Sequence, residues 1–142
     1  PGLALTAIGR AADGHGDLVP DLRELAHAAG RAVTVTGFVP DAELPARLRA
    51  AGVPVAPHRT VSASGSISTW LGAGRRPLVP DIPYTREIER RCPGALWIYH
   101  DLASALADAM ADPGRTWLGD TPVGPSTATV AAAYAKVLAG WA

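Results

Sequence analysis

The chain has 142 residues, enough for one domain and little more, and 48% of them are apolar, as in a globular domain with a hydrophobic core. Its 13 basic and 13 acidic side chains balance, so the composition gives no sign of the basic surface that a nucleic-acid binder needs. A single cysteine excludes an intramolecular disulfide and a thiolate metal cluster. No apolar run approaches the roughly 18 residues of a membrane-spanning helix, and no signal peptide is visible, so we expect a cytoplasmic protein.

Apolar and β-branched runs alternate with helical patterns along the chain. Strands are expected at residues 3–8, 32–39, 53–56, 77–79 and 95–99. Helices are expected between and after them, at residues 21–29, 40–51, 66–73, 84–91 and 102–111, with a last helix from Ser126 or Thr127 to about residue 140. This alternation predicts an α/β fold in one domain over residues 1–142, a Rossmann-like three-layer sandwich with a mostly parallel sheet of about five strands.

Loops that follow the strands should carry the ligand site. Right-handed crossovers bring all strand-to-helix loops of a parallel sheet to one edge, where ligands bind. We therefore expect the loops at residues 9–17, 37–41 and 57–65 to converge in space.

The most informative stretch is PHRTVSASGSISTW at residues 57–70, which follows an expected strand and opens an expected helix. A helix start offers unpaired backbone amides and a partial positive charge, and serine hydroxyls add donors, which together suit a diphosphate. Gly65 would let a ligand approach the backbone closely, and Arg59 could add a charge-assisted hydrogen bond. The alternative interpretation is that the serines only cap a helix and solvate a loop.

The same stretch belongs to a longer pattern, VPVAPHRTVSASGSISTWLGAGRRPLVPDIPYTREI at residues 53–88. It resembles the C-terminal, donor-binding domain of retaining GT-B glycosyltransferases of the large family 4 (glycosyl transferases group 1). The shared features are a Gly-bearing helix start, a small-residue helix that ends at Ala73-Gly74, the strand Arg76-Pro77-Leu78-Val79 and the helical segment Arg86-Glu87-Ile88. The segments VTVTGFVPDAELPARLRAAGV and DLASALADAM extend the resemblance to about residues 3–112.

The resemblance implies where a nucleotide sugar would bind. The nucleobase and ribose would meet Gly37, Phe38, Val39 and Thr69, and the diphosphate would meet Arg59, Ser62, Ser64, Gly65 and Ser66. His58 would contact phosphate or sugar, or else have a packing role, and Glu87 matches a recurrent family glutamate that would help to order the donor loop. The family usually carries two further glutamates with seven residues between them, which fall here at about Val61 and Thr69, so neither is present. No catalytic residue is assigned.

Other charged residues receive plainer interpretations. The Arg75-Arg76 pair is expected to offset the dipole at the end of its own helix, and Glu89 is expected on a solvated helix face. The four histidines have no ligand-like spacing, and no metal or cofactor is expected.

The expected function is transfer of a hexose from a nucleoside diphosphate to an acceptor, with retained configuration and without a metal. The expected partners are the nucleotide sugar and an N-terminal acceptor-binding domain of the same, longer protein, through which the enzyme could also be membrane-peripheral. Arginine supplies 12 of the 13 basic residues, which is typical of a high-GC bacterial genome. Two alternatives stay open: a sugar-nucleotide epimerase of the same architecture, for which this loop offers only His58, and a non-catalytic nucleotide-sugar-binding module.

Overall fold

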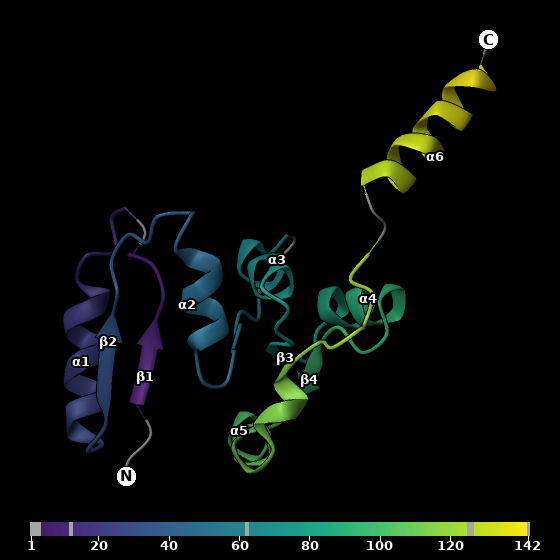
Figure 1. The fold of residues 1–142 in the computed structure, drawn as a ribbon. Coiled ribbons are helices and arrows are strands. Elements are labelled where there is room, and N and C mark those ends of the chain that lie inside the picture. The colour runs from purple at the N-terminus through teal and green to yellow at the C-terminus, as the bar shows by residue number, and fades with distance from the viewer. Residues whose placement is uncertain (1–3, 12, 62, 125–126, 142) are drawn as a thin grey trace. The chain divides into compact units, whose positions relative to one another are not determined.

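The computed structural model describes residues 4–11, 13–61, 63–124 and 127–141 (Figure 1). It is an α/β structure in which, over these residues, the strands form two separate two-stranded parallel sheets. The chain divides into two compact units, Pro1–Pro45 and Ala46–Ala142, which are described in turn.

The first unit is a parallel β-α-β crossover. Strand β1 (Ala4–Ala7), helix α1 (Leu18–Ala28) and strand β2 (Ala32–Val35) follow one another, and the register runs from Ala4 opposite Ala32 to Ala7 opposite Val35. Figure 1 shows α1 running alongside the two strands. All four residues of β1 are exposed and α1 has no buried residue, so this unit adds little to the hydrophobic core.

The loops after β1 and β2 are tied together. Gly9 and Gly37 form an isolated antiparallel bridge, and the Gly9 amide donates to the Thr36 hydroxyl at 2.9 Å. Gly37 has a φ of +72°, a left-handed conformation that ends the extended strand. For this reason β2 stops at Val35, four residues before the predicted end of that strand.

Helix α2 (Leu44–Ala50) is shorter than the helix predicted at residues 40–51. The Pro40 carbonyl accepts from the amides of Glu43 and Leu44 at 2.9 and 3.1 Å, so the chain makes a turn before the helix begins. Asp41, a residue type that often caps helices, lies in this turn and three residues before the helix begins.

The sheet of the second unit pairs β3 (Leu78–Pro80) with β4 (Trp97–Tyr99) in parallel. The strand predicted at residues 53–56 is reduced to one parallel bridge, between Val55 and Leu78. Pro54 and Pro57 flank this bridge, and proline has no amide to give to a strand ladder. In the part of the chain that is described, the single five-stranded sheet is therefore not formed.

Helices cover both faces of this second sheet. Neighbouring residues of β3 point to opposite sides, so the contacts of each residue identify the helices on its face. Val79 belongs to a buried cluster that also contains Ile67 and packs against Ile88, so α3 (Gly65–Gly72) and α4 (Pro83–Arg91) share that face. Leu78 belongs to a second cluster with Ala105 and Ala109 of α5 (Leu102–Ala111). The second unit thus has the helix–sheet–helix layering expected of an α/β fold.

A buried arginine joins segments that are distant in sequence. The side chain of Arg75, only 2% exposed, donates to the main-chain carbonyls of Leu48, Arg49, Ala51 and Gly52 and of Thr116, at the end of the 3-10 helix η1 (Pro113–Thr116). The predicted role of Arg75 was wrong in one respect. Its charge offsets the dipole at the carbonyl end of α2, not at the end of its own helix.

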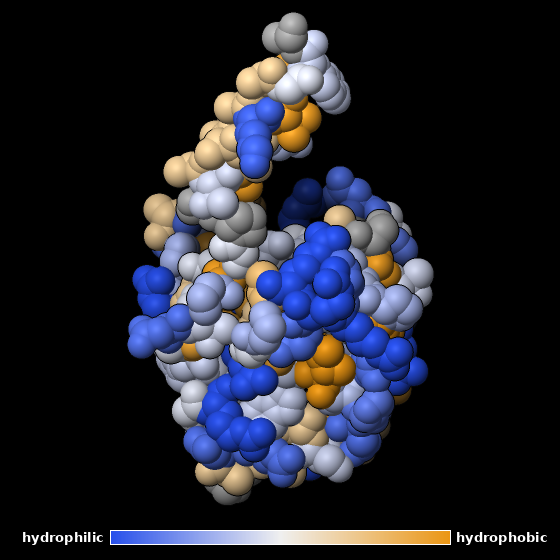
Figure 2. All heavy atoms as spheres, turned by 90° about the vertical axis from the view of Figure 1, so that its right-hand side faces the viewer, coloured by the Kyte–Doolittle hydropathy of each residue, from blue (hydrophilic) through white to orange (hydrophobic). Residues whose placement is uncertain are grey.

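The last helix, α6 (Thr127–Ala139), has no buried residue. Its large apolar side chains and the tryptophan that follows are exposed: Val130, Tyr134, Val137, Leu138 and Trp141. Figure 2 shows apolar, orange-to-tan residues along it. Within the described ranges, no helix combines the length and the apolar character needed to cross a membrane.

Candidate functional site

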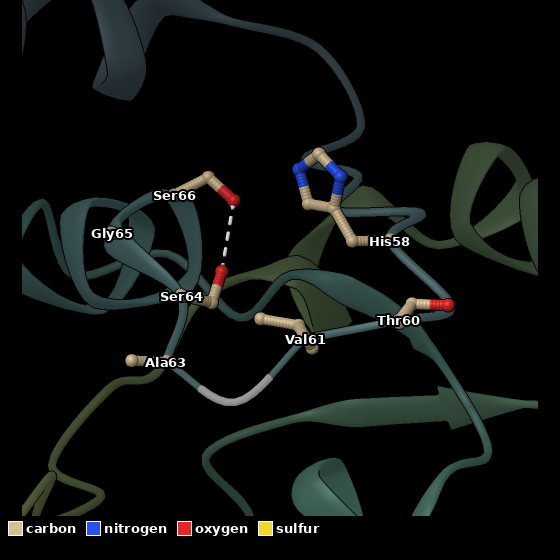
Figure 3. A pocket seen from close by; sticks show the side chains of 7 residues that line it. All are labelled: His58, Thr60, Val61, Ala63, Ser64, Gly65 and Ser66. Atoms are coloured by element: carbon tan, nitrogen blue, oxygen red, sulfur yellow. Dashed lines mark hydrogen bonds between the residues drawn. The ribbon is translucent and has the colours of Figure 1, made fainter.

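A pocket of about 260 Å³ lies at the N-terminus of α3 (Figure 3). The residues that line it come from the loop after the Val55 bridge and from the first turn of the helix: His58, Thr60, Val61, Ala63, Ser64, Gly65 and Ser66. The pocket therefore lies beyond the carboxyl end of a parallel strand segment, where α/β folds bind their ligands. The structure thus brings together four of the predicted site residues: His58, Ser64, Gly65 and Ser66.

Ser64 is the N-cap of α3. Its hydroxyl accepts from the Ile67 amide at 3.2 Å, and the residue is only 7% exposed. Its own amide donates to the Tyr84 hydroxyl at 3.0 Å, which ties the pocket to α4. The Ser64 side chain therefore builds the helix start, as the plainer interpretation of the serines proposed.

Ser66 and Gly65 present different groups to the pocket. The Ser66 hydroxyl lies 3.2 Å from that of Ser64, and the dashed line in Figure 3 marks this contact. Both residues are exposed, and they are the first two positions of α3, where backbone amides have no acceptor inside the helix. The amides of Gly65 and Ser66 and the Ser66 hydroxyl are therefore the donors that the helix can offer to a ligand.

The fold does not require a glycine at position 65. Its φ is not positive, and a Cβ atom built there would meet no other atom within 4 Å. Glycine at the first turn of a helix also has a lower helix propensity than alanine. Packing and backbone conformation thus leave this position unconstrained, and the missing side chain lets a ligand approach the Gly65 backbone closely.

Other predicted residues lie beside the pocket or outside it. The Thr69 hydroxyl donates to the Gly65 carbonyl at 2.7 Å, so it is engaged with its own helix. Arg59 is exposed and, among the described residues, forms no ion pair. Its charge acts on the Tyr99 phenol at the end of β4. Burial raises the pKa of Tyr99, and the positive charge of Arg59 partly opposes that rise. Ser62 lies outside the described residues.

The predicted nucleobase contacts belong to the first unit. Val39 is buried, Phe38 is 77% exposed, and Gly37 takes part in the bridge to Gly9. Their part in a shared site stays a prediction, as does the ribose contact of Thr69.

Glu87 pairs with its own helix. Its carboxylate accepts from Arg90 at 2.8 Å and from Arg91 at 2.6 Å, and these hydrogen bonds lower its pKa to about 2. The role in ordering the donor loop stays a prediction. The expectation for Glu89 was wrong: its carboxylate is partly buried and accepts from the amides of Gly94 and Leu96 at 2.6 and 2.9 Å, which fixes the turn into β4.

Two further polar residues at this edge were missed by the sequence analysis. Asp81 directly follows β3 and His100 directly follows β4, and their predecessors Pro80 and Tyr99 are partners in the sheet. His100 Nδ1 lies 3.3 Å from Asp81 Oδ2, and Arg86 donates to both oxygens of the same carboxylate. The Arg86 hydrogen bond holds the pKa of Asp81 below its usual value. The available sequence signal was an acid two residues after the strand expected at 77–79 and an imidazole one residue after the strand expected at 95–99.

Over the described residues, no group of three or more histidine, cysteine, aspartate or glutamate side chains could hold a metal ion. Comparison with known proteins gives no assignment: no family model, no curated protein and no solved structure matches the chain.

Proposed function

We propose that this chain is the nucleotide-sugar-binding domain of a GT-B glycosyltransferase similar to family 4, and that the pocket at the start of α3 holds the diphosphate. The observation that carries the proposal is the position of this pocket. It combines a helix N-terminus, a glycine that the fold does not need and the carboxyl edge of a parallel sheet.

The charges around the pocket support an anionic ligand. Arg59 is the neighbouring cation without an ion-pair partner among the described residues, and the first amides of α3 add a partial positive charge. The residues whose side chains line the pocket include no aspartate or glutamate in the described part of the chain. A diphosphate would therefore meet donors and no repelling carboxylate at the pocket wall.

The same groups suit the proposed chemistry. When the bond from the sugar C1 to the diphosphate breaks, negative charge builds up on the leaving oxygens, and preorganised amides and a guanidinium stabilise that charge without a metal. The proposed partners of this domain are an acceptor substrate and an N-terminal domain of the same protein that binds the acceptor.

Nucleotide binding by this chain tests the proposal. Thermal denaturation and titration calorimetry with UDP, GDP and ADP should show that at least one of them binds. A ligand present at 100 times its Kd stabilises the folded state by about 2.7 kcal/mol, which is easily measured as a rise in Tm. AMP and inorganic sulfate serve as controls for a single anionic group. If none of the three diphosphates raises the Tm, the proposed function is wrong.

The Asp81–His100 pair favours a second candidate, a sugar-nucleotide epimerase of the same architecture. Such an enzyme needs acidic and histidine side chains near the donor sugar, and the structure provides both at the carboxyl edge. Incubation of the full-length protein with UDP-hexoses in D₂O separates the candidates. An epimerase incorporates deuterium into the sugar without any acceptor, whereas a transferase releases the nucleoside diphosphate only when an acceptor is present. A binding module does neither.

A further inference from the structure

Three parallel segments of the second unit end at the same level. Val55 is bridged to Leu78, and Leu78 is paired with Trp97, so these residues lie side by side across the sheet. His58, Asp81 and His100 each follow three positions beyond one of them. The sheet register therefore places His100 and Asp81 at the edge that carries the α3 pocket.

His100 is held at one nitrogen and free at the other. Its Nδ1 faces Asp81 Oδ2 at 3.3 Å, which places the proton of the neutral ring on Nδ1. Among the described residues, Nε2 has no hydrogen-bond partner. The His100 side chain is 86% exposed, while that of Asp81 is 13% exposed, so a largely buried carboxylate orients an imidazole that faces solvent.

Neither packing nor charge balance explains why a histidine occupies position 100. A side chain so exposed buries almost no apolar surface, and Arg86 already neutralises Asp81 through both carboxylate oxygens. The arrangement resembles that of histidines that act on a ligand, in which a carboxylate fixes the ring and leaves the second nitrogen available.

We propose that His100, oriented by Asp81, is a further ligand-binding residue of this site, and that its protonated Nε2 donates a hydrogen bond to a phosphoryl oxygen of the bound nucleotide. This inference rests on the proposed function. The protonated imidazole offers a charged N–H donor, so the contact is a charge-assisted hydrogen bond that is lost when the ring is deprotonated, and the pH dependence of the affinity detects it. The ionisable groups around His100 are Asp81, Arg86, Tyr99 and Asp101, with His58 and Arg59 on the loop that reaches Tyr99.

Titration calorimetry at pH 5.5, 6.5 and 8.0 with pyrophosphate and with UDP, GDP and ADP tests this contact. The chain, His100→Gln and the control His27→Gln, at an exposed histidine of α1, are compared at each pH, so that the titration of the phosphate itself cancels between proteins. We expect His100→Gln to weaken binding about tenfold at pH 5.5 and little at pH 8.0, the magnitude of one charge-assisted hydrogen bond. His27→Gln should retain the acid dependence of binding, because His100 is still present.

A double-mutant cycle assigns Asp81 its positioning role. Asp81→Asn should weaken binding at pH 5.5 in the parent chain and have no further effect in the His100→Gln background. Equal effects in both backgrounds would mean that Asp81 acts independently of His100 and would overturn the pairing. The exposure of His100 predicts an unchanged Tm for His100→Gln without ligand, so a loss of affinity is not a loss of folding.

The outcomes separate this inference from the proposed function. If diphosphates bind, and Gly65→Ala abolishes binding while His100→Gln leaves the affinity and its pH dependence unchanged, then only the His100 contact is wrong. If no diphosphate binds the parent chain at any pH, both proposals fail.

Discussion

The guanidinium carbon of Arg75 lies 4.4 Å from the centroid of the Trp117 indole ring, so the two side chains stack. The same guanidinium donates to the carbonyls that end α2 and to the Thr116 hydroxyl, at 3.0 Å. No carboxylate takes part in these contacts among the described residues, and burial lowers the pKa of Arg75 from its usual high value. A single cation thus joins residues 48–52 to residues 116 and 117.

Replacement of Arg75 should be among the most destabilising substitutions in the second unit. Arg75→Ala leaves buried carbonyls without donors and opens a cavity, and we expect a loss of about 3–5 kcal/mol in the free energy of unfolding. Arg75→Lys should recover little of it, because an ammonium cannot reproduce the planar fork or the stacking. Urea denaturation measures both variants.

Arg115 provides the control for this substitution. It stacks on Trp97 at 4.1 Å but is exposed, so Arg115→Ala should cost less than about 1 kcal/mol. Equal losses in the free energy of unfolding for the two variants would show that stacking on tryptophan, not the hydrogen bonds to buried carbonyls, is the source of the stabilisation.

Gly65 and Gly72 form a matched pair within α3. Neither has a positive φ, and a Cβ atom would meet nothing within 4 Å at either position. Both alanine variants should fold at least as stably as the parent chain, with a gain of up to about 1 kcal/mol from helix propensity. Only Gly65→Ala should reduce diphosphate affinity, because only Gly65 lines the pocket. Calorimetry that finds equal affinities for the two variants would argue against close approach of a ligand to the Gly65 backbone.

Ser64 and Ser66 should separate stability from binding. Ser64→Ala removes the N-cap hydrogen bond to Ile67 and should lower the free energy of unfolding by about 1 kcal/mol. Ser66→Ala should leave stability within about 0.5 kcal/mol, since the residue is exposed, and should weaken diphosphate binding. Paired measurements of Tm and Kd on the two variants check this division, and a Ser66→Ala variant that loses stability but no affinity would contradict it.

Glu87 should make stability depend on pH in the acid range. Its pKa falls from 4.5 to about 2 in the folded state because Arg90 and Arg91 donate to it. A carboxylate with a depressed pKa contributes stability that is fully present above pH 4.5 and is lost as the pH falls towards 2. The Tm difference between the parent chain and Glu87→Gln should therefore shrink over this range and with added salt. Glu24→Gln, at an exposed glutamate of α1, serves as the comparison variant.

Local sequence signals predicted the helices of the second unit well. The helix predicted at residues 102–111 is confirmed at Leu102–Ala111, and its N-cap Asp101 accepts from the Ser104 amide at 2.8 Å. The predicted start of α3 differs by one residue, because Ser64 caps it and Gly65 already belongs to it. Caps and apolar periodicity act within a few residues, so they can be read from sequence.

Features that depend on distant partners could not be predicted in this way. The partners of Arg75 lie 23 to 41 residues away, and only the folded chain shows that they are carbonyls at and just after the end of α2 and at the end of η1. The Asp81–His100 pair requires the register of β3 against β4, which neither short strand specifies by itself. At residues 53–56, Pro54 and the following Pro57 outweighed the apolar pattern that predicted a strand.

The hydrogen bond from the Ser64 amide to Tyr84 has a consequence for the entropy of ligand binding. Tyr84 packs against the buried cluster that contains Ile67 and Val79, so the hydrophobic core itself fixes the first turn of α3. Folding has therefore already removed the conformational freedom of this wall of the pocket. A ligand that binds there need not order it again, and most of the interaction energy at that wall is retained as affinity.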